Sequence, residues 1–273
     1  MCVPGCHEAV VANLSRRGLF RAAGGATAAV ALSSALPSGA LGQTMSFSRV
    51  IDLTHTLVPD FPTYFGPPQL VIETEKTFEK DGFQVFKWTL LEHTGTHMDA
   101  PFHFAKEGLS ADKLDPSVLV VPLVVIDIKE RATADPDAQL MAADIEAFEQ
   151  ANGPLPENCC VAMNSGWAQH VGTERFRNAG ADGMMHFPGF HPDAANMLLQ
   201  RNVAGIAVDT LSLDFGASQD FAVHATWLPA GRWGLEAIAN LDEAPATGAT
   251  LVVGSPKVIN ATGGPSRLFA LLP

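Results

Sequence analysis

The sequence is poor in several residue types, and each shortage argues against a class of protein. Only four of the 273 residues are cysteine, one is tyrosine, and 17% are charged. Cys2 and Cys6 fall in an N-terminal segment that is treated separately below, which leaves the adjacent pair Cys159 and Cys160. Neighbouring residues of a strand point to opposite faces, so we expect one of this pair in the core and one at the surface, with no disulfide framework.

Positive charge is scarcer than negative charge, and the formal net charge is −12. The chain has no run rich in lysine and arginine and no stripe of basic and aromatic residues, so no nucleic-acid partner is expected. It also lacks a Gly-x-Ser-x-Gly motif, the turn that carries the nucleophile of many serine hydrolases. A hydrolase built on this chain would need another source of nucleophile.

The first 43 residues have the pattern of an export signal. Ser15-Arg16-Arg17-Gly18-Leu19-Phe20 is a twin-arginine sequence, and residues 22–32 form an apolar stretch of small residues. That stretch is shorter than the roughly 20 residues that a membrane-spanning helix needs. We therefore expect residues 1–43 to direct export to the periplasm or the medium, and residues 44–273 to form the functional domain, without membrane contact once the signal is removed.

The most informative stretch is residues 93–103, His-Thr-Gly-Thr-His-Met-Asp-Ala-Pro-Phe-His, which contains three imidazoles and a carboxylate. The offsets between His93, His97, Asp99 and His103 are all even, and side chains at even offsets share one face of an extended chain. β-Branched residues, a glycine and a proline disfavour a helix here. The sequence predicts a strand that ends in a turn at the Ala-Pro pair, with the four polar groups on one side.

Such a cluster is typical of a divalent metal site. Neutral imidazole nitrogens and a carboxylate oxygen suit zinc, with manganese or iron as competitors, and four polar groups facing one way need partners when they are buried. The candidates for completing the site are His224 and Glu236, which lie twelve residues apart with a proline and two glycines between them. We expect this intervening loop to fold back and Glu236 to open a short helix over residues 235–241.

Hydrophobic periodicity predicts more strands than helices. We expect strands over residues 48–58, 70–78, 83–93, 119–128, 159–163, 205–208, 250–259 and 267–272, and helices over residues 142–151 and 193–201. The run over 119–128 is almost continuously apolar, as in a strand that is buried on both faces. The predicted fold class is α/β, a single domain with a mixed sheet or barrel-like β core and outer helices.

The motif His-x3-His-x-Asp-Ala-Pro-x-His, together with the segment that begins at Ile51-Asp-Leu-Thr-His55, resembles the putative cyclase family. The best-known members of this family are metal-dependent bacterial kynurenine formamidases and isatin hydrolases. The resemblance covers nearly all of the chain after the signal. It implies a swivelling β/β/α domain that assembles as a homodimer or homotetramer.

The resemblance also implies a role for each polar residue of the cluster. The ligands of a first ion would be His93, His97 and Asp99, and those of a second ion would be Asp99, His224 and Glu236, with Glu236 touching both ions. His103 carries over as the proton donor and acceptor rather than as a ligand. In the isatin hydrolase branch the position of Glu236 is not acidic and one ion is found, so Glu236 favours the two-metal branch.

The expected substrate contacts are aromatic. Tyr64 lies in Pro62-Thr-Tyr-Phe-Gly66, where formamidases use a tryptophan against an aromatic substrate, so here tyrosine replaces tryptophan and Phe65 replaces proline. These two rings, with Phe102 and Trp167, are expected to form the apolar wall of a small-molecule pocket. The departure from the formamidase pattern concerns the identity of the substrate and leaves the chemistry unchanged.

The sequence thus favours a metal-dependent hydrolase that cleaves a C–N bond in a small formamide or cyclic amide, with metal-activated water and His103 as acid and base. An alternative with the same chemistry is a hydrolase of lactones or other small cyclic esters. A third alternative, from a different class, is a periplasmic metal-binding protein without turnover. His103 argues against the third, because a storage site has no need of an imidazole placed as a base.

Overall fold

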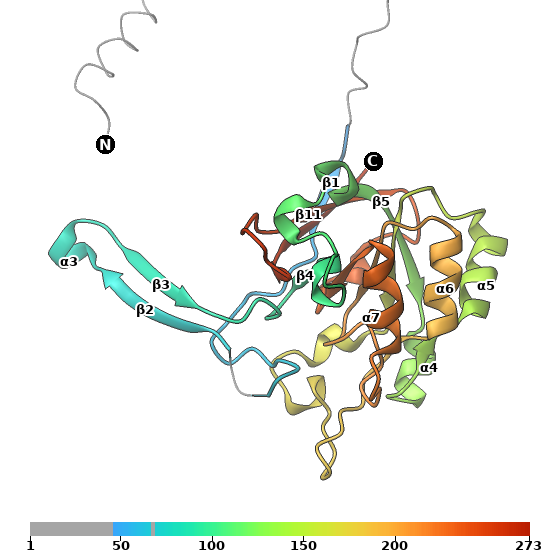
Figure 1. Ribbon diagram of the computed structural model, residues 1–273, viewed down its shortest axis with the longest axis horizontal. Coiled ribbons are helices and arrows are strands. Elements are labelled where there is room, and N and C mark those ends of the chain that lie inside the picture. The colour runs from blue at the N-terminus through green and yellow to red at the C-terminus, as the bar shows by residue number, and fades with distance from the viewer. Residues whose placement is uncertain (1–45, 67–68) are drawn as a thin grey trace, which may run out of the picture. The chain divides into compact units, whose positions relative to one another are not determined.

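A mixed sheet of nine strands forms the centre of the protein in this computed structural model, which describes residues 46–66 and 69–273 (Figure 1). In sheet order the strands are β1 (Arg49–Asp52), β13 (Arg267–Leu272), β11 (Ala249–Gly254), β5 (Val120–Asp127), β7 (Cys160–Asn164), β9 (Gly205–Val208), β10 (Trp233–Glu236), β4 (His97–Asp99) and β12 (Gly263–Pro265). Strands β5, β7, β9 and β10 pair in parallel, and all other pairs of the sheet are antiparallel. The predicted α/β domain with a mixed sheet is confirmed, and Ser46–Pro273 forms one unit. The predicted export signal, residues 1–43, lies outside the described residues.

Both faces of the central strands are covered, which explains the continuous apolar run over 119–128. Leu123 and Val125 of β5 enter one core cluster, and Val124 and Ile126 enter the other. The second cluster lies under three helices, α5 (Ala142–Asn152), α6 (Pro192–Gln200) and α7 (Ala222–Trp227) (Figure 1).

Cys159 and Cys160 point to opposite faces as predicted, but both faces are covered and neither thiol is at the surface. Burial raises the pKa of Cys159 to about 11 and that of Cys160 well above its usual value. Thiols with such pKa values are protonated at neutral pH and unreactive. The cysteines therefore serve as small core residues.

The remaining helices and strands are short. They are β2 (Val71–Lys76), α3 (Phe78–Asp81), β3 (Val85–Thr89), α4 (Lys129–Ala134), β6 (Gln139–Leu140) and β8 (Gly189–Phe190), with 3₁₀ helices at Pro101–His103, Ala111–Lys113, Pro116–Leu119, Trp167–His170, Glu174–Phe176, Leu228–Ala230 and Leu241–Glu243. Strands β6 and β8 form a separate parallel pair. Among the residues that the structure describes, no helix is both long and apolar enough to cross a bilayer.

Strands β2 and β3 form an antiparallel hairpin that extends away from the sheet, with α3 at its tip (Figure 1). We call residues 71–89 the arm. It exposes large apolar side chains, among them Trp88, whose exposed fraction is 68%, and Phe86, whose exposed fraction is 51%. The chain leaves for the arm soon after the Tyr64 loop and returns just before His93, so the two ends of the arm lie next to the predicted site in the sequence.

Candidate metal centre

Strand β4 carries two of the predicted ligands between two neighbouring strands. His97 and Asp99 are its first and last residues, so their side chains share one face while Met98 enters the core on the other. In β10, Glu236 is the register partner of His97, and in β12, Gly263 lies opposite Asp99. Strand pairing therefore places an imidazole and two buried carboxylates on one surface.

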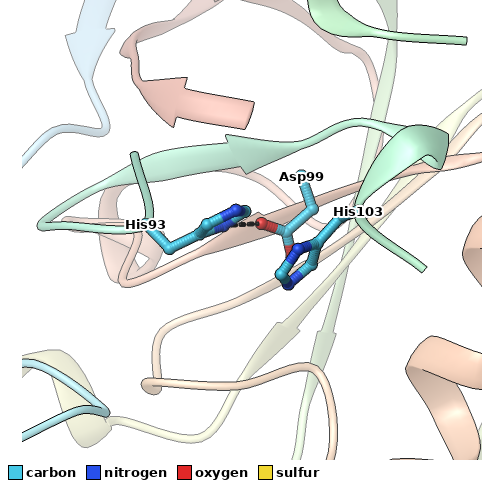
Figure 2. A group of neighbouring side chains, drawn as sticks. All are labelled: His93, Asp99 and His103. Carbon is cyan, nitrogen blue, oxygen red and sulfur yellow. Dashed lines mark hydrogen bonds and ion pairs between the residues drawn. The ribbon is translucent and has the colours of Figure 1, made fainter. Parts of the chain in front are cut away.

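His93 and His103 reach this surface from outside the strand, which corrects the prediction of one extended segment. The chain bends at Gly95, whose φ of +69° is a left-handed value that favours glycine. The predicted turn after β4 is present as the 3₁₀ helix that contains His103. Figure 2 shows His93 and His103 beside Asp99, and the two imidazole rings stack with centroids 3.9 Å apart and an interplanar angle of 25°.

His224 and Glu236 approach from the other side of β4. The predicted helix over residues 235–241 is wrong, because Glu236 ends β10 and the chain then turns at Ala237, which has a φ of 50°. His224 lies in α7, and Gly231, with a φ of +79°, turns the chain back toward β10. The loop thus folds back as expected, and His224 Nε2 lies 3.1 Å from Glu236 Oε1.

Asp99 and Glu236 are each shared between the same two imidazoles. Asp99 Oδ1 lies 3.3 Å from His97 Nε2, and its Oδ2 lies 3.4 Å from His224 Nε2. Glu236 Oε2 lies 3.4 Å from His97 Nε2, and its Oε1 lies 3.1 Å from His224 Nε2. Each carboxylate therefore presents one oxygen to each imidazole, which is a donor arrangement suited to a pair of neighbouring cations.

The hydrogen bonds of His97 test whether this donor set fits a metal ion. Its Nδ1 lies 2.8 Å from the carbonyl oxygen of Gly95, which can only accept, so Nδ1 carries a proton. In a neutral ring Nε2 then has the lone pair, and this nitrogen faces two carboxylates. Within the described part of the chain, neither His97 Nε2 nor Asp99 Oδ2 has a hydrogen-bond partner, although both atoms are buried. A cation would satisfy both atoms, so the residues fit a divalent metal ion.

His224 is oriented in the same way by a carboxylate. Its Nδ1 lies 2.6 Å from Asp214 Oδ2, which leaves Nε2 to face Asp99 and Glu236. Asp214 also accepts the backbone N–H groups of Val223, at 2.8 Å, and of His224, at 3.1 Å, at the start of α7. One carboxylate therefore fixes both the helix and the imidazole that it carries, as outer hydrogen-bond partners of metal ligands commonly do.

The pKa shifts follow from this crowding of charge. Burial by itself would lower the pKa of His97, but the carboxylates of Asp99 and Glu236 raise it to about 10. Burial would raise the pKa of Asp99, but the neighbouring imidazoles hold it well below its usual value. The pKa of His97 is high because the two carboxylates stabilise a positive charge at this ring, and a bound metal ion would supply a positive charge at the same place. Burial lowers the pKa of His103 to about 4, so this imidazole is neutral near pH 7.

A cavity of about 170 Å³ opens onto the cluster. Its polar lining includes His93, His97, His103, His224 and Glu236, and its aromatic lining consists of Tyr64, Phe65, Phe104 and Phe221. The ring centroid of Tyr64 lies 5.7 Å from that of Phe221, and the ring centroid of Phe104 lies 4.9 Å from that of His224. Since a cavity of about 150 Å³ accommodates benzene, there is room for an aromatic ring beside the polar cluster.

Two aromatic residues of the predicted wall lie elsewhere. Phe102 does not line the cavity, and Trp167, with an exposed fraction of 2%, packs in a separate core cluster. The 3₁₀ turn after β4 has three residues per turn, so it directs Phe102 and Phe104 differently from an extended chain. Sequence reasoning missed Phe104 and Phe221, although the position of Phe104 directly after His103 was an available signal.

The segment Asp209–Asp214 contains two buried carboxylates with different partners. Asp214 binds His224 as described, whereas Asp209 accepts from Ser165 Oγ and, at 2.8 Å, from the backbone N–H of Trp167. Burial is the main cause that raises the pKa of Asp209 to about 6. Asp209 thus holds a neighbouring loop. The pattern of polar residues alone could not separate these two roles.

Comparison with known proteins agrees with this geometry. Residues 51–215 match the model of the family described as "Putative cyclase", and this segment contains the whole motif from His93 to His103. The chain belongs to this family. The matched segment ends before His224 and Glu236, so the evidence for these two residues is their geometry.

The similar proteins are hydrolases. Isatin hydrolase of Roseibium aggregatum is 35% identical over 244 residues, which cover 82% of this chain and 92% of that protein. Kynurenine formamidase of Bacillus cereus is 29% identical over 181 residues, which cover 66% of this chain and 77% of that protein. The solved structure of isatin hydrolase A from Labrenzia aggregata bound to benzyl benzoate has a TM-score of 0.78 and 35% identity, and the match covers 82% of this chain and 93% of that chain. The chain is a homologue of these C–N bond hydrolases.

Proposed function

We propose that this protein is a metal-dependent amidohydrolase that cleaves the C–N bond of a cyclic amide or formamide attached to an aromatic ring. The observation that carries the proposal is the pair of carboxylates, Asp99 and Glu236, shared between two imidazoles beside an aromatic cavity. Similarity to isatin hydrolase and kynurenine formamidase supports this substrate class. The resemblance further supports assignment to the swivelling β/β/α type of domain.

The ligands that we propose fall into two overlapping sets, one of His93, His97 and Asp99 and one of Asp99, His224 and Glu236. The mixture of imidazole nitrogens and carboxylate oxygens favours zinc, with manganese as the second choice. A divalent ion bound here would lower the pKa of a water molecule from about 15.7 toward 7 and polarise the substrate carbonyl. Two ions per chain are supported by the two carboxylates, each of which has an oxygen for either set.

His103 would transfer the proton. Its ring lies at the cavity wall, stacked on His93, and is neutral near pH 7. When a water oxygen bonds to the carbonyl carbon, His103 accepts the proton that the water loses. As the C–N bond breaks, the same imidazole returns this proton to the departing nitrogen. A formamide gives formic acid and an amine, whereas a cyclic amide gives one ring-opened molecule that carries both a carboxylic acid and an amine. In both cases the products contain all atoms of the substrate and of one water molecule.

The aromatic lining would hold the ring of the substrate and keep other water away. Tyr64 and Phe65 form one part of this lining, and Phe104 and Phe221 form another. An apolar wall around a few converging polar groups is the usual construction of a small-molecule site. Binding of the ring against these residues would leave the amide carbonyl beside the polar cluster.

The test compares wild type with His103→Ala for metal content, by elemental analysis, and for hydrolysis of isatin and N-formylkynurenine. We expect equal metal content and a loss of turnover of about 10²- to 10⁴-fold, because the variant keeps the proposed ligands and loses the proton carrier. A matched control is His170→Ala, since His170 lies in the 3₁₀ helix Trp167–His170, outside the cavity lining. This control should keep both properties.

Each other outcome has a definite meaning. Loss of metal from His103→Ala would show that His103 is a metal ligand. The geometry allows this, because the possible ligand atoms of His93, Asp99 and His103 all lie within 4.8 Å of one another. Activity on lactones but not amides would identify the cyclic ester hydrolase. A metal-loaded wild type that hydrolyses neither amides nor lactones would overturn the proposal and identify a metal-binding protein without turnover.

We also propose that residues 1–43 export the protein through a twin-arginine route to the periplasm or the medium. The support is the Arg16-Arg17 pair followed by an apolar stretch of small residues. Replacing both arginines with lysine should retain the full chain in the cytoplasm of a bacterial host, as measured by cell fractionation. Equal export of the doubly substituted chain would contradict this assignment.

A further inference from the structure

We propose that Glu92 and Thr262 form a positioning pair that determines which nitrogen of His93 faces the metal centre. The inference rests on the proposed function, because it concerns the proposed ligand His93. Neither residue was singled out by the motif, and neither lines the cavity. Both lie behind the imidazole, on the side away from Asp99, and they act only through His93.

The contacts form a chain of three groups. His93 Nδ1 lies 2.7 Å from Asp99 Oδ1, and His93 Nε2 lies 2.9 Å from Thr262 Oγ1. The Thr262 hydroxyl in turn donates to Glu92 Oε2. The same Glu92 oxygen accepts the backbone N–H of Thr262 at 3.2 Å.

These contacts fix the direction of each hydrogen bond. Glu92 Oε2 is an acceptor, because it receives a backbone N–H, which can only donate. A threonine hydroxyl has one proton, and this proton is used toward Glu92. Thr262 Oγ1 can therefore only accept from His93, so Nε2 of His93 carries a proton. In a neutral ring this leaves the lone pair on Nδ1.

The Nδ1 lone pair of His93 then faces the carboxylate oxygen of Asp99 at 2.7 Å. Two lone pairs at this separation repel each other unless a positive charge lies beside both. The pair behind His93 therefore prepares the ring to bind a cation through Nδ1, together with Asp99. Without the pair, the ring could place its proton on Nδ1 and hydrogen-bond to Asp99 instead, which would remove it as a ligand.

All three proposed imidazole ligands share this construction, although their partners differ. In each ring, the nitrogen that is turned away from Asp99 and Glu236 donates a hydrogen bond. His97 Nδ1 donates to the Gly95 carbonyl oxygen, His224 Nδ1 donates to Asp214, and His93 Nε2 donates to Thr262. The first partner is a backbone group and the second is a buried carboxylate. Only His93 depends on a relay through a hydroxyl, and this relay lies where β12 begins beside β4.

The experiment measures zinc affinity, by competition with a chelator of known affinity, in wild type, Thr262→Val, Thr262→Ser and Glu92→Gln. We expect Thr262→Val to lower the affinity about 10- to 100-fold, as is typical when the outer partner of a metal ligand is lost. Thr262→Ser keeps the hydroxyl and should stay within about 3-fold of wild type. Glu92→Gln should lower the affinity, because its amide is a weaker acceptor and can also donate to Thr262.

A spectroscopic measurement separates positioning from folding. In the zinc-loaded wild type, nitrogen-15 NMR of the imidazoles should show His93 protonated at Nε2, and in Thr262→Val this signal should broaden or change. Thr54→Val is a matched control, because Thr54 Oγ1 accepts the backbone N–H of Leu268 at 2.8 Å, far from any imidazole ligand in the sequence. This control should lower thermal stability and leave zinc affinity unchanged.

Two results would overturn the inference: wild-type zinc affinity in Thr262→Val, or a His93 ring protonated at Nδ1 in the loaded wild type. These results are independent of the proposed function. An active wild type with an unaffected Thr262→Val would refute only the positioning pair. A wild type that hydrolyses no amide, but loses zinc when Thr262 is replaced by valine, would refute only the proposed function.

Discussion

Asp214 is the residue on which the His224 half of the metal centre depends. Asn in its place keeps the size of the side chain but loses the charge and one acceptor oxygen, so the bond to His224 Nδ1 is weakened. We expect Asp214→Asn to lower the affinity for the ion that His224 would bind about 10- to 100-fold, measured by titration with a chelator. Asp52→Asn, which changes an exposed carboxylate that pairs with Arg267, should leave the affinity unchanged. Equal affinities in wild type and Asp214→Asn would contradict this role.

Asp209 should make the stability of the folded chain depend on pH. Burial is the main cause that raises its pKa in the folded state from the usual 3.8 to about 6, so between these values the folded state binds more protons than the unfolded state. The contribution of Asp209 to stability is therefore present below about pH 4 and is lost as pH rises through about 6. The loss is about 3 kcal/mol, from roughly two pKa units at about 1.4 kcal/mol each.

Urea unfolding of wild type and Asp209→Asn between pH 4 and pH 7 measures this effect. The difference in unfolding free energy, wild type minus variant, should fall as pH rises, because asparagine does not titrate. Other carboxylates titrate equally in both proteins and cancel in the difference. A difference that is independent of pH would show that the hydrogen bonds from Ser165 and Trp167 keep Asp209 ionised throughout.

At the scale of single elements, strand β12 approaches strand β4 closely at Gly263. A β-carbon on Gly263 would lie 2.1 Å from the backbone oxygen of Met98 and 3.0 Å from His93 Cε1. A backbone oxygen cannot rotate away from a new methyl group as a side chain can, so Gly263→Ala must push strands β12 and β4 apart. We expect a loss of unfolding free energy of at least about 2 kcal/mol and a lower zinc affinity, because Thr262 moves with β12.

Gly82→Ala provides the matched control for this substitution. Gly82 has a φ of +77° at the tip of the arm, and a β-carbon there would meet no atom within 4 Å. Its substitution should cost about 1 kcal/mol from the left-handed backbone and leave zinc affinity unchanged. The prediction fails if denaturant unfolding and chelator titration show the same values for the two variants.

The sequence predicted the elements whose pattern is local and missed those that depend on their neighbours. The strands over 205–208 and 267–272 have the predicted bounds, because short, largely apolar runs bounded by turn residues indicate strands. The helix expected over 235–241 has helix-forming residues, but pairing of β10 with β9 and β4 overrides that propensity. Strand pairing between distant segments leaves no such local signature.

The same division applies to the site. His97 and Asp99 could be placed on one face from their spacing, because β4 is a strand there. His224 and Glu236 could not, since their relation to β4 depends on the turn at Gly231 and on the register of β10. Phe104 lines the cavity and Phe102 does not, because both lie in or beside a 3₁₀ turn, where the direction of each side chain does not follow from its spacing in the sequence.

At the scale of the whole molecule, the arm is a segment whose large apolar side chains stay exposed in a single chain. An isolated two-stranded hairpin is only marginally stable in water, and this one exposes Phe86 and Trp88. We propose that the homodimer or homotetramer implied by the family resemblance covers the arm with a second copy of the chain. Light scattering on purified protein should then give a multiple of the single-chain mass.

Replacing Phe86 and Trp88 together with serine should shift this assembly toward the single chain. Lys87→Ser is the matched control, because Lys87 lies between these two residues and pairs with Glu73 at the surface. It should leave the assembled mass unchanged, since an exposed ion pair contributes little. A wild type with the mass of one chain, or a double variant with unchanged mass, would rule out the arm as the contact.

The shared carboxylates have a consequence for the order of folding. The ligands of the second proposed ion set, Asp99, His224 and Glu236, are distant in sequence, and β4 meets β10 only when these distant segments of the chain have come together. Contacts of such long sequence separation form late, because closing a large loop costs entropy before any contact rewards it. An ion of the second set therefore cannot nucleate this fold. It can bind only after the apolar core has assembled the sheet, so the time course of its uptake would report a late stage of folding.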